Sequence, residues 1–322
     1  MTSLYSYRSR LFVVIAGAAL AAGCSKASKD ASHGKKGASP AAKAAFQYLP
    51  KDSASLIGMG ALLKSGVVSD LVKGRAAQML PPEFKAIKDK CGVDLLSDVS
   101  SAVVAIGADR KDKTKQFAVI TGKFNRKQIN DCANKSEIDG KKLSAKDDGK
   151  LTAYSRAGED TTFYAYWPDD HTLVASAAPN NKAPLQAVMH PKQNVTSNAK
   201  VMALVADINT RATVWAVGDI QLKGISVDTP DASLLELYFD AGLKANLRLR
   251  YANSGAASKA KSSIEARVAK MKKSPFGGLV APFLENLSLG TSGNDAVIKL
   301  QLDEKKLKRL AGLTKSFGGM GR

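Results

Sequence analysis

Short apolar runs of strand length, each ended by turn-forming or helix-capping residues, are the feature that most constrains this chain. Residues 99–107 and 116–123 are two such runs, and Asn125 is placed to cap a helix through about residue 134. Strands are also expected at 54–60, 151–156, 161–167 and 172–178, and helices at 62–73 and 82–91. Short connections between strands favour antiparallel pairing, so the pattern predicts an α+β fold.

The second half of the chain repeats part of this order. Strands are expected at 201–207, 213–220, 234–241, 246–251, 287–291 and 296–302, with helices at 256–273 and 276–285 and a final helix after Asp303. Residues 116–130 and 295–309 each run from an apolar strand through a capping residue into a basic helix start. We therefore expect two lobes, 46–190 and 191–322, each an antiparallel sheet packed with helices, and a weak internal repeat.

Residues 1–23 have the form of a signal peptide. Arg8 and Arg10 precede the uncharged run 11–23. As a helix this run would reach only about 20 Å, short of the roughly 30 Å hydrocarbon core of a bilayer. The segment is therefore expected to be removed rather than to span a membrane.

Residues 20–24, Leu-Ala-Ala-Gly-Cys, resemble the lipobox of bacterial lipoproteins. The resemblance implies cleavage between Gly23 and Cys24 and a membrane anchor of fatty acyl chains, such as palmitate, on Cys24. Ala21 departs from the leucine preferred at its position. Ser25, after the cysteine, implies sorting to the outer membrane, facing the periplasm or the cell surface. The stretch 48–65 is also similar to the start of uncharacterised secreted bacterial proteins with tandem α+β halves, a likeness that implies no activity.

Residues 24–45 carry the lipidated cysteine and are otherwise rich in Lys, Ala, Ser and Gly. Because they lack large apolar side chains, we expect a flexible tether with a reach of about 25 Å.

Cys91 and Cys132 are the cysteines that remain once Cys24 is acylated. Disulfides persist in secreted and periplasmic proteins, so we expect a Cys91–Cys132 disulfide. Two separate buried thiols are the alternative.

The chain offers little that points to catalysis. Its three histidines, His33, His171 and His190, form no HxxxH or HxH spacing and there is no CxxC pair, so neither a metal site nor another cofactor is expected. Residues 168–171 read as a hairpin turn rather than an acid–base site. Two Ser-x-x-Lys matches, at 197–200 and 258–261, lack the accompanying SDN and KTG elements and are attributed to chance. We expect no enzyme.

Positive charge is concentrated near the C-terminus. Residues 241–322 hold 16 Lys and Arg against 5 Asp and Glu, a net +11 of the total +19. Helical spacing in 256–273 places Ala257, Ile264, Val268 and Met271 on one side and basic residues on the other. Residues expected to bind an anionic surface are Arg248, Arg250, Lys259, Lys261, Arg267, Lys270, Lys272, Lys273, Lys305, Lys306, Lys308 and Arg309. An ordinary solvated surface is the alternative.

Together these features predict a lipid-anchored envelope lipoprotein that acts as a non-enzymatic binding or structural module. Its expected partners are the membrane that holds Cys24 and, at the basic face, anionic lipid or lipopolysaccharide. Nucleic acid is not expected in that compartment, and the sequence indicates no protein partner. A periplasmic carrier of apolar, lipid-like ligands is the alternative function, and a serine hydrolase is less favoured.

Overall fold

The computed structural model describes residues 36–60, 92, 98–138, 140–220, 228–240, 242–274, 277–307 and 309. The expected helices at 62–73 and 82–91 lie outside these residues. The described helices are α3 (Pro40–Phe46), α8 (Arg126–Lys135), α9 (Ala183–Met189), α10 (Ala199–Ala206), α11 (Ser254–Lys272) and α12 (Gly277–Leu284). The strands are β1 (Ser53–Met59), β2 (Val99–Gly107), β3 (Gln116–Gly122), β4 (Glu137–Ile138), β5 (Lys141–Asp148), β6 (Leu151–Arg156), β7 (Thr162–Asp169), β8 (Thr172–Ser176), β9 (Val214–Gly218), β10 (Ala232–Tyr238), β11 (Gly242–Arg250), β12 (Leu287–Ser292) and β13 (Asp295–Asp303).

These strands form one sheet in the order β12-β13-β11-β10-β9-β1-β2-β3-β8-β7-β6-β5-β4. Neighbouring strands pair antiparallel, and the predicted α+β class is confirmed. The sequence suggested a separate sheet for each lobe, but β1 of the first half pairs with β9 of the second over Ser55–Met59 and Val214–Gly218. This pairing closes two strand edges that separate sheets would leave open.

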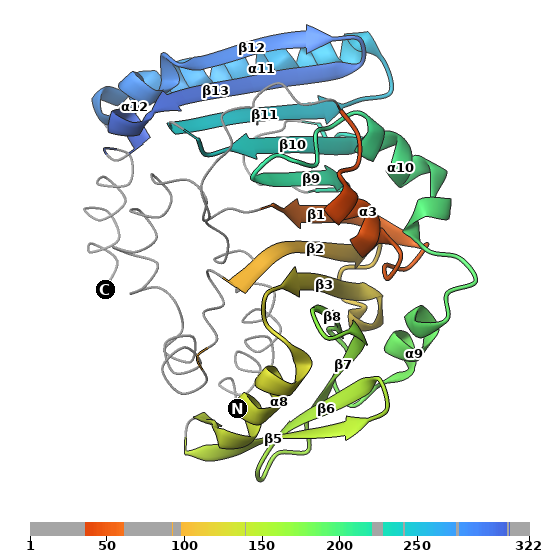
Figure 1. The fold of residues 1–322 in the computed structure, drawn as a ribbon. Coiled ribbons are helices and arrows are strands. Elements are labelled where there is room, and N and C mark those ends of the chain that lie inside the picture. Colours follow the sequence, from red (N-terminus) through yellow and green to blue (C-terminus); the bar gives the residue numbers. More distant parts are fainter. Residues whose placement is uncertain are drawn as a thin grey trace.

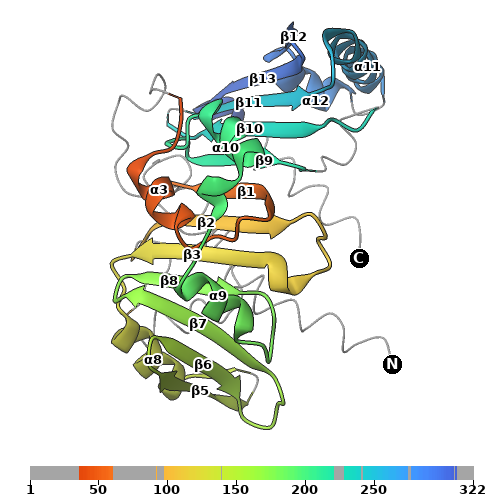
Figure 2. The ribbon, with the colours of Figure 1, turned by 90° about the vertical axis from the view of Figure 1, so that its right-hand side faces the viewer.

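Helices cover both faces of the sheet. Figures 1 and 2 show α3, α9 and α10 along one face. On β11, Arg248 is the register partner of Leu234, and both side chains point to the face that carries α3, α9 and α10. Leu247 and Leu249 point to the opposite face and pack against α11. Ile129 of α8 packs with Trp167 in a cluster separate from the one that contains α3. The helices α8 and α11 therefore lie near opposite ends of the sheet.

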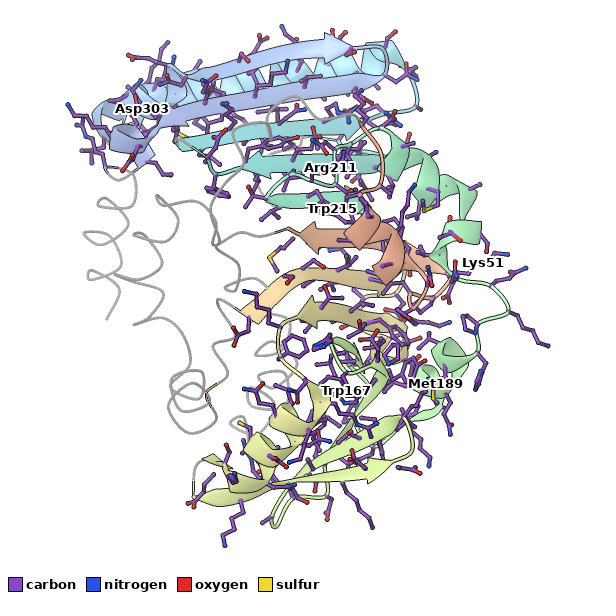
Figure 3. All side chains as sticks on the ribbon, viewed as in Figure 1. Lys51, Trp167, Met189, Arg211, Trp215 and Asp303 are labelled. Carbon is purple, nitrogen blue, oxygen red and sulfur yellow. The ribbon has the colours of Figure 1, made fainter. Side chains whose placement is uncertain are left out.

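The largest hydrophobic cluster crosses the junction between the halves. It runs from Phe46 of α3 and Val103 of β2 to Trp215 of β9 and Leu234 of β10. The rings of Phe46 and Trp215 meet edge to face with centroids 6.2 Å apart. Figure 3 places Trp215 near the middle of the sheet and Trp167 lower, on β7. The two halves thus share a core as well as a sheet.

The junction also repeats internally. Helix α3 is capped by Ser39 and α10 by Asn198, two residues 159 positions apart. Burial repeats with the same offset through helix, loop and strand, in the buried pairs Ala42 and Val201, Ala45 and Leu204, Phe46 and Val205, Leu49 and Ile208, and Leu56 and Trp215. The segments α3–β1 and α10–β9 are therefore two copies of one structural unit.

Hydrogen bonds across the junction are reciprocal. The Gly37 amide donates to the Ile208 carbonyl at 2.6 Å, and the Val195 amide donates to the Leu49 carbonyl at 2.9 Å. The cap residues follow the same rule. Asn198 donates its amide to the Lys51 carbonyl at 2.8 Å, and the Ser39 amide donates to the hydroxyl of Thr210 at 2.6 Å. Each copy thus binds the loop of the other, as expected for an approximate twofold axis between β1 and β9.

The repeat extends outward from this axis, although the sequence aligned the wrong strands. Strands β1, β2 and β3 are followed by α8, and β9, β10 and β11 are followed by α11. Both helices begin after an asparagine cap, Asn125 and Asn253. The counterpart of β3 is therefore β11, whereas the sequence comparison had matched 116–130 with 295–309. Strand–cap–helix segments look alike wherever they occur, which explains the error.

Three further elements differ from expectation. Residues 201–207, predicted as a strand, belong mostly to helix α10, because a short apolar run fits either structure and the Asn198 cap selects the helix. Residues 40–45, assigned to the tether, lie in α3, where Ala42 and Ala45 are buried despite their small size. Strand β5 was not expected, because six of its eight side chains are polar or charged and the apolar ones are confined to Leu143 and Ala145.

Candidate anionic-surface site

Helix α11 carries five of the predicted basic residues and is held on the sheet by a narrow apolar stripe. The Asn253 side chain accepts a hydrogen bond of 2.9 Å from the Ala256 amide and caps the first turn. Ala257, Ala260 and Ile264 are buried against the sheet. Because two of these side chains are alanine, the helix lies close to the strands and its other side stays open to solvent.

Two lysines in the first turns of α11 have acidic partners. Lys259 Nζ lies 3.2 Å from Asp228, and Lys261 Nζ lies 2.8 Å from Glu265, the one acid within α11. The second half of the helix, after Glu265, contains basic residues and no acid. Its exposed basic residues are Arg267, Lys270, Lys272 and the following Lys273. Positive charge is therefore concentrated toward the C-terminal end of α11.

The start of the final helix adds basic residues at the same end of the sheet. Asp303, which Figure 3 shows beside α12, accepts a hydrogen bond of 2.7 Å from the Lys306 amide. Lys306 Nζ donates to the Asn286 side chain just after α12, at 3.0 Å. Lys305 and Arg309 are exposed, and Lys308 lies outside the described residues.

Arg248 and Arg250 do not belong to this surface. They lie on the face of β11 opposite α11, where Arg250 Nε is 2.8 Å from Asp295 and its Nη2 is 2.8 Å from Asp207. Arg248 Nη2 donates to the Asp207 carbonyl at 2.5 Å. The hydrogen bond with Asp295 raises the pKa of Arg250 against the effect of burial. The sequence showed the alternation along β11 but not that register pairs Arg250 with Asp295, so both arginines are structural.

Two apolar side chains at the basic end of α11 were not expected on the surface. Helical spacing placed Met271 on the buried side, but it is 47% exposed, and Leu279 of α12 is 39% exposed. The available signal was the charge pattern around them, since no acid occurs between Glu265 and Glu285.

The structure describes one of the two cysteines of the predicted disulfide. Cys132, in α8, is disulfide-bonded and buried, with its sulfur 3.8 Å from the Ser136 hydroxyl. Its expected partner, Cys91, and the expected lipidation site, Cys24, lie outside the described residues. The Cys91–Cys132 pairing therefore stays a prediction.

A polar groove of about 350 Å³ lies between α8 and the β5–β6 hairpin. At its edge, one carboxylate oxygen of Asp147 accepts hydrogen bonds from Thr152 at 2.7 Å, Arg126 at 2.8 Å and Asn130 at 2.8 Å. The Tyr154 hydroxyl donates to Oδ1 of the Asn130 side chain at 2.6 Å. Arg126 Nε is buried without a hydrogen-bond partner among the described residues, but the other contacts of the network hold α8 against the hairpin.

The candidate catalytic motifs lie in structural positions. Asp169 accepts the His171 amide at 2.8 Å within the β7–β8 turn, and His171 Nδ1 lies 2.9 Å from the Phe124 carbonyl. Of the two Ser-x-x-Lys matches, Lys261 is paired with Glu265, and Ser197 and Lys200 are both exposed at the start of α10.

Within the described residues, no cluster of His, Cys, Asp or Glu has the geometry to hold a metal ion. A search of the same residues found no helix with the length and apolarity needed to cross a membrane.

Comparison with known proteins gives one structural neighbour to report. No protein-family model matches the chain. No curated protein matches its sequence. A crystal structure of the protein TP0453 aligns with 84% of this chain and 96% of its own, at a TM-score of 0.46 and 12% sequence identity.

Proposed function

We propose that this chain is a lipid-anchored envelope lipoprotein that acts as a non-enzymatic binding module toward anionic envelope surfaces. Cys24 would hold the protein at a membrane, facing the periplasm or the cell surface. The basic side of α11 and the start of the final helix would bind the anionic groups. The observation that carries the proposal is the exposed, unbalanced charge of Lys270, Lys272 and Lys273 at one end of α11.

The electrostatics support a surface rather than a small site. Each Lys or Arg close to an anionic membrane contributes on the order of 1 kcal/mol, and the contribution falls off within a Debye length of about 10 Å. Three adjacent lysines are therefore enough for weak, reversible attraction. The acyl anchor would supply the lasting attachment, because a charged patch alone is released by salt.

The test uses the mature chain with Cys24→Ser, so that no acyl chain contributes to binding. We expect it to sediment with vesicles that contain anionic phospholipid, to bind neutral phosphatidylcholine vesicles far less, and to be released as salt rises. The triple variant Lys270→Glu, Lys272→Glu and Lys273→Glu should weaken anionic binding roughly a hundredfold.

The matched control makes the same charge change on the first half, at the exposed residues Lys135, Lys142 and Lys146. It should retain most of the binding. Equal binding to anionic and neutral vesicles, or equal losses in the two triple variants, would overturn the proposed function.

A further inference from the structure

The apolar stripe of α11 continues beyond the part that the sheet covers. Ala257, Ala260 and Ile264 are buried, Val268 is half-buried, and Met271 is 47% exposed. These residues are three or four positions apart, so they share one side of the helix. Met271 is thus the exposed end of a stripe that is otherwise packed.

Leu279 lies on the next helix, α12, whose first residue is hydrogen-bonded to the end of α11. The Gly277 amide donates to the Ser274 carbonyl at 2.7 Å, and the Ser274 hydroxyl donates to the Met271 carbonyl at 2.8 Å. A Cβ at Gly277 would stand 1.9 Å from the Lys272 carbonyl oxygen, so this position requires glycine. These contacts join the end of α11, with Met271, to the start of α12, with Leu279, and we call this junction the α11–α12 corner.

The α11–α12 corner combines these apolar side chains with cations. Met271 and Leu279 are the large hydrophobic side chains exposed in the described part of the chain. Lys270, Lys272 and Lys273 flank Met271 and are exposed. Residues 266–284 contain no acid. Exposed apolar side chains gain nothing from contact with a soluble polyanion, whereas both features of the corner suit the interface of a bilayer.

We propose that the α11–α12 corner inserts into the interfacial region of an anionic phospholipid bilayer. This rests on the proposed function and narrows its partner to lipid. Met271 and Leu279 would enter the boundary between headgroups and acyl chains, and the lysines would extend their long side chains to the phosphates. The contact between Gly277 and Ser274 holds the start of α12 at the end of α11, where the basic groups lie.

The decisive probe is an indole at position 271, read by quenching with brominated phospholipid. The native tryptophans, Trp167 and Trp215, are 2% and 1% exposed and supply a buried background. With Cys24→Ser as the parent, Met271→Trp should be quenched in anionic brominated vesicles. The control Ala266→Trp, at an exposed site on another side of α11, should be quenched much less.

A second measurement compares affinities. The variant Met271→Asp, Leu279→Asp should bind anionic vesicles at least about tenfold more weakly while keeping the circular dichroism spectrum of its parent. If it binds as well as its parent and the indole at 271 is not quenched, insertion is wrong and electrostatic binding stands. If the parent binds no anionic vesicle, both proposals fail. A concentration-dependent dimer abolished by the same substitutions would assign the corner to self-association and overturn insertion.

Discussion

The backbone of Gly58 lies directly against the indole of Trp215. The two residues are register partners on β1 and β9, and a Cβ built on Gly58 would stand 2.0 Å from Cε2 of that ring. Trp215 is 1% exposed and packed edge to face on Phe46, so its ring has no space to move. Close packing at the junction of β1 and β9, the seam between the halves, therefore depends on the absence of a side chain at position 58.

Gly58→Ala should destabilise the protein by about 1–3 kcal/mol, because an added methyl group overpacks the core at the seam. Gly290→Ala is the matched control, since a Cβ there meets nothing within 4 Å. Urea unfolding compares the two midpoints. Equal midpoints for both variants would contradict the packing argument.

Asp295→Ala should cost about 3 kcal/mol, because it removes the buried carboxylate that Arg248 and the half-buried Arg250 share. Lys261→Ala removes one member of the solvent-facing ion pair with Glu265 on α11. It should cost about 0.5 kcal/mol or less. Thermal and urea unfolding provide the measurement. Similar losses in the two variants would show that the ion pairs of Arg248 and Arg250 with Asp295 do not stabilise the fold.

Asp147 is expected to make the first half sensitive to acid. Burial acts to raise the pKa of its carboxyl, but hydrogen bonds from Thr152 and Arg126 outweigh burial and lower it below 3.8. A carboxyl whose pKa is lower in the folded state than in the unfolded state stabilises the folded protein. This contribution is fully present above the unfolded-state pKa and is lost as the pH falls through the folded-state pKa. Below about pH 4, the urea midpoint should therefore fall more steeply for the natural protein than for Asp147→Asn. Parallel profiles would contradict this assignment.

Cys91→Ala and Cys132→Ala should each destabilise the protein by about 4 kcal/mol, the chain-entropy value for a loop of about 40 residues. Peptide mapping without reduction should recover Cys91 linked to Cys132. A different partner for Cys132, or unequal losses in the two variants, would refute the pairing.

Mass spectrometry of the N-terminal peptide from native membranes should find a chain that begins at an acylated Cys24. Cys24→Ser should release the protein from the membrane fraction. An uncleaved or unmodified Cys24 would disprove the lipoprotein assignment.

Much of the fold follows from local patterns. The asparagine cap at Asn125 and the short apolar runs along β2, β3, β9 and β13 led to elements that the structure contains. Local pattern failed at residues 201–207, where an apolar run fits a strand or a buried helix equally well. It also failed in α3, because the alanines there are buried against segments that are distant in the sequence, such as β2.

The surface was less predictable than the fold. That Arg250 meets Asp295 depends on the register of β11 with β13, and that Met271 is exposed depends on how far the sheet extends beneath α11. Both are relations between distant segments, which periodicity along one element does not encode.

The reciprocal seam has a consequence for how such a chain arises. One half alone would leave its first strand with an open edge, a site for pairing with another chain. Two identical halves would close that edge on each other, because the contacts from Gly37 to Ile208 and from Val195 to Leu49 are nearly interchangeable. The single chain therefore has the architecture of a symmetric homodimer fused into one polypeptide. The two copies are not identical, since one carries the disulfide-bonded Cys132 and the other carries the basic helix.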